Sequence, residues 1–288
     1  PLLDRHLEDD EVEQKIFERH MANGFSAFFS KVRDMGFTMA NLCYPMSIDP
    51  DENPDGLHPV YAANCADALM TFTPIEKQLL LRALDSSITQ HRSSLRIFTP
   101  KTSIRALIRQ LEGDEKAAYP CRGGLDFFFV DCKDGNTYPC GFRGKENLGP
   151  LWSLERRHQS ETHECRACEW ECFRDPSEML GPFLHALEDP LGFVARIRKD
   201  PATFKTWVDD LKYYDACGLF DGRVAPTFER LERWAPTQEE GVLTRDLSQA
   251  IRSLVQLGRP VVQPLTPSPT SQRSSSLSSQ DALERDRL

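Results

Sequence analysis

The sequence lacks any apolar run approaching the roughly 18 residues that a helix needs to cross a bilayer. It also lacks an excess of positive charge: the formal net charge is −9 and the pI about 5.4. That balance disfavours a nucleic-acid binder, because such proteins present a basic face. The N-terminal stretch PLLDRHLEDDEVEQ is acidic and polar, unlike a secretory signal peptide. We therefore expect a cytoplasmic protein with no nucleic-acid or membrane partner.

The motifs of several enzyme classes are also missing. The chain has no glycine-rich phosphate loop, no Gly-x-Ser-x-Gly elbow and no zinc-protease motif. It has instead nine cysteines in 288 residues. Because the cytoplasm keeps thiols reduced, clustered cysteines there indicate metal binding or catalysis rather than disulfides.

Helical and strand patterns alternate in the first part of the chain. Apolar residues recur at helical spacing over 9–35 and 104–111, and TPIE at 73–76 predicts a helix start with a capping box. The apolar stretches 37–45 and 95–98 predict buried strands. This order favours an α/β layer or barrel with parallel strands.

The pattern changes at residue 119. Strands are expected at 125–131 and 137–140, joined by Lys133-Asp134-Gly135-Asn136, which is a good hairpin turn. Residues 141–174 read as loop. The chain then returns to helix, with Asp175-Pro176-Ser177-Glu178 resembling a capping box and Gly181-Pro182 expected to break or kink the helix.

The last part of the chain divides into helix and tail. Asp200-Pro201 predicts a helix reaching about Cys217, and 238–257 predicts another. Residues 262–288 are rich in Pro and polar side chains, with seven serines between 265 and 280, and are expected to be disordered.

The cysteines fall into two sets. Cys43, Cys65 and Cys217 stand alone in apolar or helical contexts and are expected to be small buried hydrophobic residues. The other six lie within one loop-rich stretch: Cys121, Cys132, Cys140, Cys165, Cys168 and Cys172.

Cys165-x-x-Cys168 places two thiols on one tight turn, and Cys121 with Cys140 supplies a second pair upstream. Four such sulfurs suit a structural zinc ion. The wide spacing of the upstream pair favours an iron–sulfur cluster, which accepts thiolates from separate segments, but does not settle the choice. A redox Cys-x-x-C needs a helix N-terminus after a strand, and the charged segment 155–168 disfavours one.

The same residues carry a family resemblance. Cys121, thirteen residues, Gly135, four residues and Cys140 resemble the Cys-x(9–15)-Gly-x(4)-Cys pattern of radical S-adenosylmethionine (SAM) enzymes of the SPASM and Twitch subgroups. The segment GFRGKENLGPLW, directly after Cys140, is similar to theirs, and Cys165-x-x-Cys168 stands where their second ligand pair is expected. The small number of further cysteines resembles the single-cluster Twitch arrangement.

The resemblance implies an auxiliary [4Fe–4S] cluster held by Cys121, Cys140, Cys165 and Cys168, with Cys172 either replacing Cys168 or serving as a spare thiol. It implies an α/β fold: the C-terminal part of a partial (β/α) barrel, a hairpin and loop region for the cluster, and a helical C-terminal segment. The corresponding boundaries are 1–115, 116–188 and 189–261, followed by the tail 262–288.

In this family such clusters anchor substrate or pass electrons during radical modification of a small molecule or peptide. A flavodoxin or ferredoxin is the implied reductant.

The sequence departs from the family in one respect. The Cys-x(3)-Cys-x(2)-Cys loop, which holds the SAM-cleaving cluster, is absent. Since Pro1 is not an initiator residue, we expect the sequence to begin partway through the barrel, so that SAM and a second [4Fe–4S] cluster belong to a longer parent chain. The alternative hypothesis is a non-enzymatic interaction module stabilised by a zinc ion that four cysteines hold.

Other residues near the cysteines have several interpretations. Arg143 and Lys145 are candidates to bind an anionic substrate or to donate hydrogen bonds to cluster sulfurs, and a solvated pair is an equal alternative. Cys132 is expected in the core or beside the ligands rather than as a ligand. His163 and His185 are candidate ligands, but solvated loop histidines are the favoured interpretation.

Overall fold

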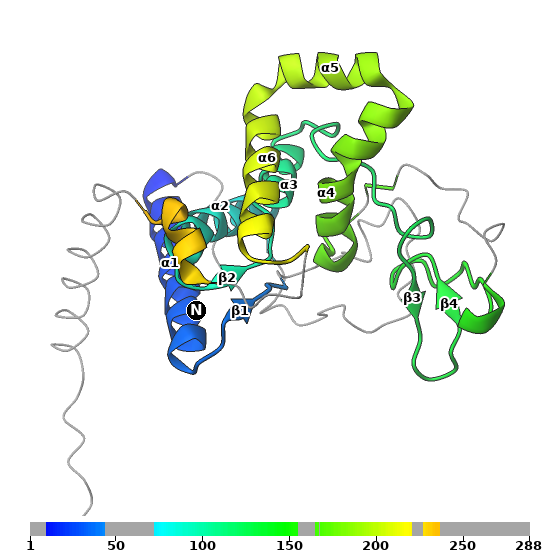
Figure 1. Cartoon of the computed structure of the whole chain (residues 1–288), viewed down its shortest axis with the longest axis horizontal. Coiled ribbons are helices and arrows are strands. Elements are labelled where there is room, and N and C mark those ends of the chain that lie inside the picture. The colour runs from blue at the N-terminus through cyan, green and yellow to red at the C-terminus, as the bar shows by residue number, and fades with distance from the viewer. Residues whose placement is uncertain (1–9, 44–71, 155–164, 167, 221–226, 237–288) are drawn as a thin grey trace, which may run out of the picture. The chain divides into compact units, whose positions relative to one another are not determined.

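Two short parallel strands lie among the first three helices of the structure (Figure 1). The computed structural model describes residues 10–43, 72–154, 165–166, 168–220 and 227–236. Strand β1 (Met39–Ala40) pairs in parallel with β2 (Arg96–Ile97), with Met39 opposite Arg96. Their parallel pairing confirms the direction expected from the alternating helix and strand patterns.

Helices α1 (Glu11–Asp34), α2 (Pro74–His91) and α3 (Lys101–Leu111) enclose a core with this sheet. The helix start predicted at TPIE is confirmed, because Thr73 accepts the Glu76 N–H and Glu76 accepts the Thr73 N–H. The fully enclosed part of the core consists of Phe29, Leu84, Ile88, Leu95, Ile97, Ile104 and Leu107. The described part of the chain is therefore mixed α/β and mostly helical, and it contains no closed barrel.

The strands are shorter than the apolar stretches 37–45 and 95–98 that predicted them. At the end of β1, the Leu42 N–H donates to the Thr99 hydroxyl at 3.0 Å instead of to a strand carbonyl. The outer edge of β2 is closed by helix α6 (Pro201–Ala216), whose Tyr213 hydroxyl accepts the Ile97 N–H at 3.0 Å. The Tyr214 hydroxyl donates to the Phe98 carbonyl at 2.6 Å. Side chains thus satisfy backbone groups that a longer sheet would pair.

Helix α6 also caps helix α3. The residue before α3 is Pro100, which offers no side-chain cap. Asp210 of α6 replaces it, since its Oδ2 accepts both the Thr102 N–H at 2.8 Å and the Thr102 hydroxyl at 2.7 Å. Burial raises the pKa of Asp210 to about 6, although both hydrogen bonds oppose the shift.

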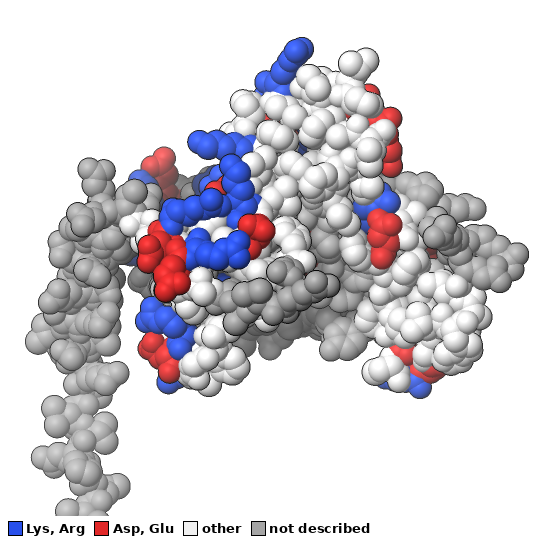
Figure 2. All heavy atoms as spheres, in the orientation of Figure 1, with Lys and Arg blue, Asp and Glu red and all other residues white. Residues whose placement is uncertain are grey.

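The predicted hairpin is present as β3 (Phe129–Val130) and β4 (Thr137–Tyr138), paired antiparallel. Gly135 has φ +73° in the turn, as the Asp-Gly signal predicts. The ladder is short because the Gly124 N–H donates to the Phe127 carbonyl at 2.7 Å, making a separate turn within the expected strand. Charged side chains of both signs gather at the tip, whereas most of the hairpin surface visible in Figure 2 is uncharged.

Helix α4 (Glu171–Glu188) corrects two expectations. It begins four residues before Asp175, so the predicted capping box lies inside the helix, where Glu178 accepts the Tyr119 N–H at 2.6 Å. Gly181-Pro182 lies inside the helix, so the expected break is wrong, while the alternative of a kink stays a prediction. A Cβ on Gly181 would lie 2.3 Å from Cγ of Tyr119, so this glycine is needed for close packing.

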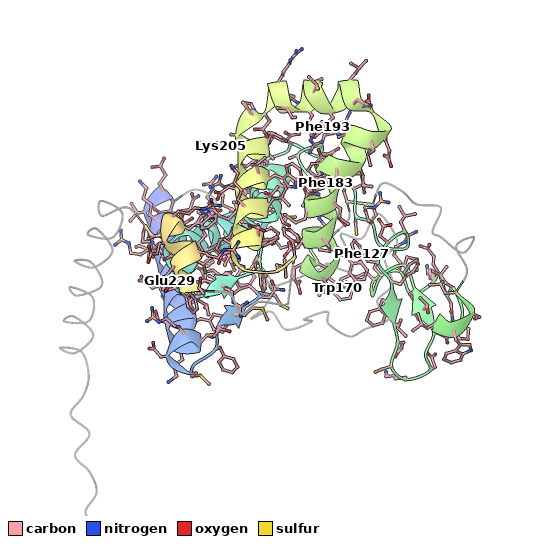
Figure 3. All side chains as sticks on the ribbon, viewed as in Figure 1. Phe127, Trp170, Phe183, Phe193, Lys205 and Glu229 are labelled. Atoms are coloured by element: carbon pink, nitrogen blue, oxygen red, sulfur yellow. The ribbon has the colours of Figure 1, made fainter. Side chains whose placement is uncertain are left out.

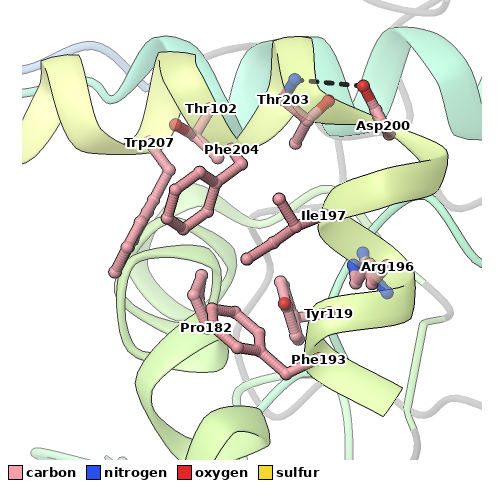
Figure 4. A pocket seen from close by; sticks show the side chains of 10 residues that line it. All are labelled: Thr102, Tyr119, Pro182, Phe193, Arg196, Ile197, Asp200, Thr203, Phe204 and Trp207. Carbon is pink, nitrogen blue, oxygen red and sulfur yellow. Dashed lines mark hydrogen bonds between the residues drawn. The ribbon is translucent and has the colours of Figure 1, made fainter. Parts of the chain in front are cut away.

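Helices α5 (Pro190–Lys199) and α6 follow directly, each beginning at a proline. The predicted start of α6 is confirmed, since Asp200 accepts the Thr203 N–H at 3.1 Å. Figure 4 shows Asp200 and Thr203 at a cavity of about 30 Å³, which Tyr119 and Trp207 also line. That volume holds a water molecule but no organic ligand.

Two short 3-10 helices, η3 (Leu151–Ser153) and η5 (Phe228–Trp234), complete the described elements.

Several predictions fall on residues outside the described ranges. They are the helix at 238–257, the tail 262–288, Cys65 and His163. Among the helices that are described, none combines the length and the apolar character needed to span a membrane.

Candidate metal centre

Three separate segments bring four cysteines together. Cys121 follows Tyr119-Pro120, Cys140 follows β4, and Cys165 and Cys168 precede α4. The Cys121 N–H donates to the Cys165 carbonyl at 2.8 Å, in an isolated antiparallel bridge that joins the two cysteine pairs through their backbones. These are the four residues that the family resemblance implied as ligands.

Aromatic side chains surround the four thiols. Phe142 and Phe173 are buried in the same cluster as Cys121 and Cys140. Trp170 packs on both of them, with ring centroids 5.4 Å from Phe142 and 4.9 Å from Phe173. Figure 3 labels Trp170 and Phe127, two partly buried residues that pack against this cluster. The sulfurs therefore lie in an apolar environment from which water is largely excluded.

Backbone N–H groups point at three of the sulfurs. The Gly123 N–H donates to Cys121 Sγ at 3.4 Å. The backbone N–H of Phe142 lowers the pKa of Cys140 and that of Trp170 lowers the pKa of Cys168, as donors near a sulfur do, whereas the Arg143 N–H donates to the Cys140 carbonyl at 3.3 Å. Each of these turns places a donor two residues after the cysteine. Such donors favour a negatively charged sulfur, and hydrogen bonds to sulfur also tune iron–sulfur clusters.

Without a cation, these thiols favour the protonated form. The pKa of Cys140 is raised to about 11, mainly by burial and in part by the neighbouring thiols, because thiolates repel one another. Burial is likewise the main cause that raises the pKa of Cys121 and Cys168. A metal supplies the positive charge that lets such thiols ionise, so binding would release protons and stabilise the fold.

Two glycines allow the segments to approach each other. A Cβ on Gly123 would lie 2.9 Å from the Pro139 carbonyl oxygen, and a Cβ on Gly141 would lie 2.6 Å from the Trp170 ring. Gly141 directly follows Cys140, and Gly123 lies two residues after Cys121. Larger residues at these positions would push Cys121, Cys140 and Cys168 apart.

The thiols converge without forming a ready-made site for one ion. Within the described residues, no group of three His, Cys, Asp or Glu side chains could hold a metal ion as placed. Nevertheless, Cys121, Cys140 and Cys165 each contribute to the electrostatic environment of Cys168, so the four sulfurs share one environment.

Comparisons with known proteins add no family assignment. No protein-family model, curated protein or solved structure matches this chain. The candidate site is therefore defined by its residues and their geometry.

Arg143 and Lys145, the basic residues that follow Cys140, differ in their surroundings. The Arg143 side chain forms an ion pair with Glu146 at 2.5 Å, so its guanidinium is committed to that carboxylate. Its backbone N–H donates to the Cys140 carbonyl oxygen at 3.3 Å. Lys145 is exposed to solvent.

The remaining cysteines lie apart from the four. Cys132 is exposed in the hairpin turn, so the expectation of a core position is wrong. Cys217 is fully buried as predicted, whereas Cys43 is exposed, contrary to prediction. Cys172 is exposed beside Glu171, whose carboxyl accepts its thiol at 3.4 Å.

His185 is not a loop residue. It lies in α4, half-buried against the rings of Tyr119 and Phe193. Sequence analysis also missed Trp170 and Glu171, which begin α4 immediately after the cysteine pair. An aromatic residue two positions after a Cys-x-x-C pair is a signal that could have indicated the enclosing wall.

Proposed function

We propose that Cys121, Cys140, Cys165 and Cys168 hold a [4Fe–4S] cluster, and that this chain is a C-terminal part of a radical SAM enzyme. The observation that carries the proposal is the convergence of four thiols, three of them facing backbone N–H donors, inside one apolar cluster. The parallel β1–β2 pair with α1–α3 is compatible with the last units of a partial barrel.

The sequence spacing of the upstream pair supports a cluster over a single zinc ion. Cys121 and Cys140 have eighteen residues between them, whereas structural zinc sites usually take each pair of cysteines from one short turn. A cluster of several irons takes thiolates from positions further apart. The zinc module with four cysteine ligands is the alternative, and metal analysis separates the two.

Four cysteine ligands favour electron transfer over direct substrate binding. When bound, a [4Fe–4S] cluster supplies one-electron transfer. With four thiolates the protein fills the coordination positions, leaving none for substrate. The apolar wall of Phe142, Trp170 and Phe173 keeps water from the sulfurs, and the backbone N–H groups stabilise their negative charge. We propose an electron carrier for the radical modification of an unidentified small molecule or peptide, with a flavodoxin or ferredoxin as reductant.

The test compares serine variants that differ only in where the thiol lies. Cys140→Ser removes a thiol inside the apolar cluster, whereas Cys132→Ser and Cys172→Ser remove exposed thiols. We expect Cys140→Ser to lose most of its iron and both controls to retain it, measured as iron and acid-labile sulfide per anaerobically purified chain. Retention of iron by Cys140→Ser, or its loss from Cys132→Ser, contradicts the ligand assignment.

A further inference from the structure

A large apolar cavity lies next to the cysteine cluster. Its volume is about 840 Å³, within the range of roughly 300–1,000 Å³ that small-molecule sites occupy. Helix α4 contributes Met179, Leu180 and Phe183, while Phe127 belongs both to this cavity and to the cluster of four thiols. The remaining apolar lining comes from Phe98, Leu211, Tyr214, Leu219 and Phe220.

This apolar surface is partly open to solvent. Phe183 is 48% exposed and Phe220 is 63% exposed, and both line the cavity. Contiguous exposed apolar surface is rare in soluble proteins and commonly marks a binding site. Figure 3 labels Phe127 and Phe183, which come from different elements of this wall.

One part of the cavity lining is acidic. Glu171 and Asp175, in the first turns of α4, lie among the lining residues together with Asn41 and Cys172. Glu171 is 2% exposed, and its Oε2 atom has no hydrogen-bond partner within the described structure. A buried polar atom without a partner costs free energy, so its presence points to a group that the structure does not contain.

The charges around Glu171 indicate what that group is. Its position at the N-terminus of α4 stabilises a negative charge through the helix dipole. Among the described lining residues none is Lys or Arg, so the lining itself supplies no cation to Glu171. Burial and then the charge of Glu171 raise the pKa of the Cys172 thiol, and a hydrogen bond to Glu171 is the largest cause that raises the pKa of the Cys43 thiol. These thiols therefore add no second negative charge near neutral pH.

We propose that this cavity binds a small apolar amine. The ammonium group donates to the Glu171 carboxyl group, with Asp175 adding negative potential, and the hydrocarbon part lies against the wall of α4 and α6. Binding by this site is independent of the identity of the metal. It requires neither the cluster nor SAM, so its failure would leave the proposed function unaffected.

The first test uses the full chain, purified anaerobically, and compounds of matched length. n-Hexylamine, 1-hexanol and hexanoate differ in their charge at pH 7 but share one hydrocarbon chain. Calorimetric titration should show hexylamine binding at least tenfold more tightly than hexanol, with hexanoate weakest, because only the ammonium can form an ion pair with Glu171 in addition to a hydrogen bond. From n-butylamine to n-octylamine, affinity should rise by up to about fourfold per methylene. Equal binding of amine, alcohol and carboxylate, or no binding of the amines, overturns the proposal.

The second test changes the acid while keeping its shape. Glu171→Gln should weaken hexylamine binding at least tenfold and leave hexanol binding unchanged. Glu188→Gln, at the exposed end of the same helix, is the matched control and should bind both compounds as the wild type does. If Glu171→Gln retains folding by circular dichroism and binds hexylamine with wild-type affinity, the assignment to Glu171 is wrong. The comparison of compounds on the wild-type chain decides the proposal even if this variant does not fold.

Discussion

Gly141→Ala should separate the cysteine pairs, because the new methyl group would clash with Trp170. A Cβ at this position would lie 2.6 Å from two atoms of the Trp170 ring, about 1 Å inside normal van der Waals contact. Trp170 cannot turn away easily, because it is packed against Phe129, Phe142 and Phe173. Overpacking of this kind typically costs about 1–3 kcal/mol. We expect a loss of that size in the free energy of unfolding, together with loss of bound iron.

The matched control is Gly24→Ala. Gly24 lies in the middle of α1, and a Cβ there would meet nothing within 4 Å. The same chemical change should therefore stabilise the protein by about 0.5–1 kcal/mol, since alanine favours helix. Anaerobic urea unfolding of both variants, with iron measured on the same samples, checks the two signs. A Gly141→Ala variant with wild-type stability and full iron content would refute the placement of Trp170 over Gly141.

Two further predictions concern the scaffold. Burial gives Asp210 a raised pKa of about 6 in the folded state, so its contribution to stability is fully present below about pH 4 and is lost as the pH rises through about 6. In the wild type, the urea midpoint of unfolding should fall between pH 4 and 7, and Asp210→Asn should make this fall smaller. An equal fall in the wild type and the variant would contradict the prediction. Thr73→Ala removes the capping box of α2 and should cost about 1 kcal/mol. Thr227→Ala, at an N-cap without a side-chain hydrogen bond, should cost much less in the same unfolding assay.

Local sequence signals predicted the helix starts and the turn correctly where no tertiary contact opposed them. The capping box at Thr73, the Asp200 cap and the turn at Gly135 depend on residues a few positions apart, and all three are confirmed. The signal at Asp175 failed because tertiary contacts override local ones: Glu178 bonds the distant Tyr119 N–H instead of a cap residue. Gly181 does not break the helix; a glycine is needed there because any side chain would clash with Tyr119.

The site was predictable in its ligand residues but not in its surroundings. Spacing and resemblance singled out the four cysteines that the structure brings together. The backbone donors at Gly123 and Phe142 follow from turn geometry that no residue type encodes. Cys132 was misplaced because an apolar stretch precedes it, while the turn itself leaves its thiol in solvent. Burial of Glu171 depends on packing between distant elements, which sequence patterns do not reveal.

Metal analysis of the purified protein decides whether the four cysteines hold an iron–sulfur cluster. The full chain is purified anaerobically, and iron, zinc and acid-labile sulfide are measured on one sample. We predict a brown protein with about four irons and about four sulfides per chain, which loses both in Cys140→Ser. A colourless protein carrying about one zinc and no sulfide would contradict the cluster and favour the structural zinc module.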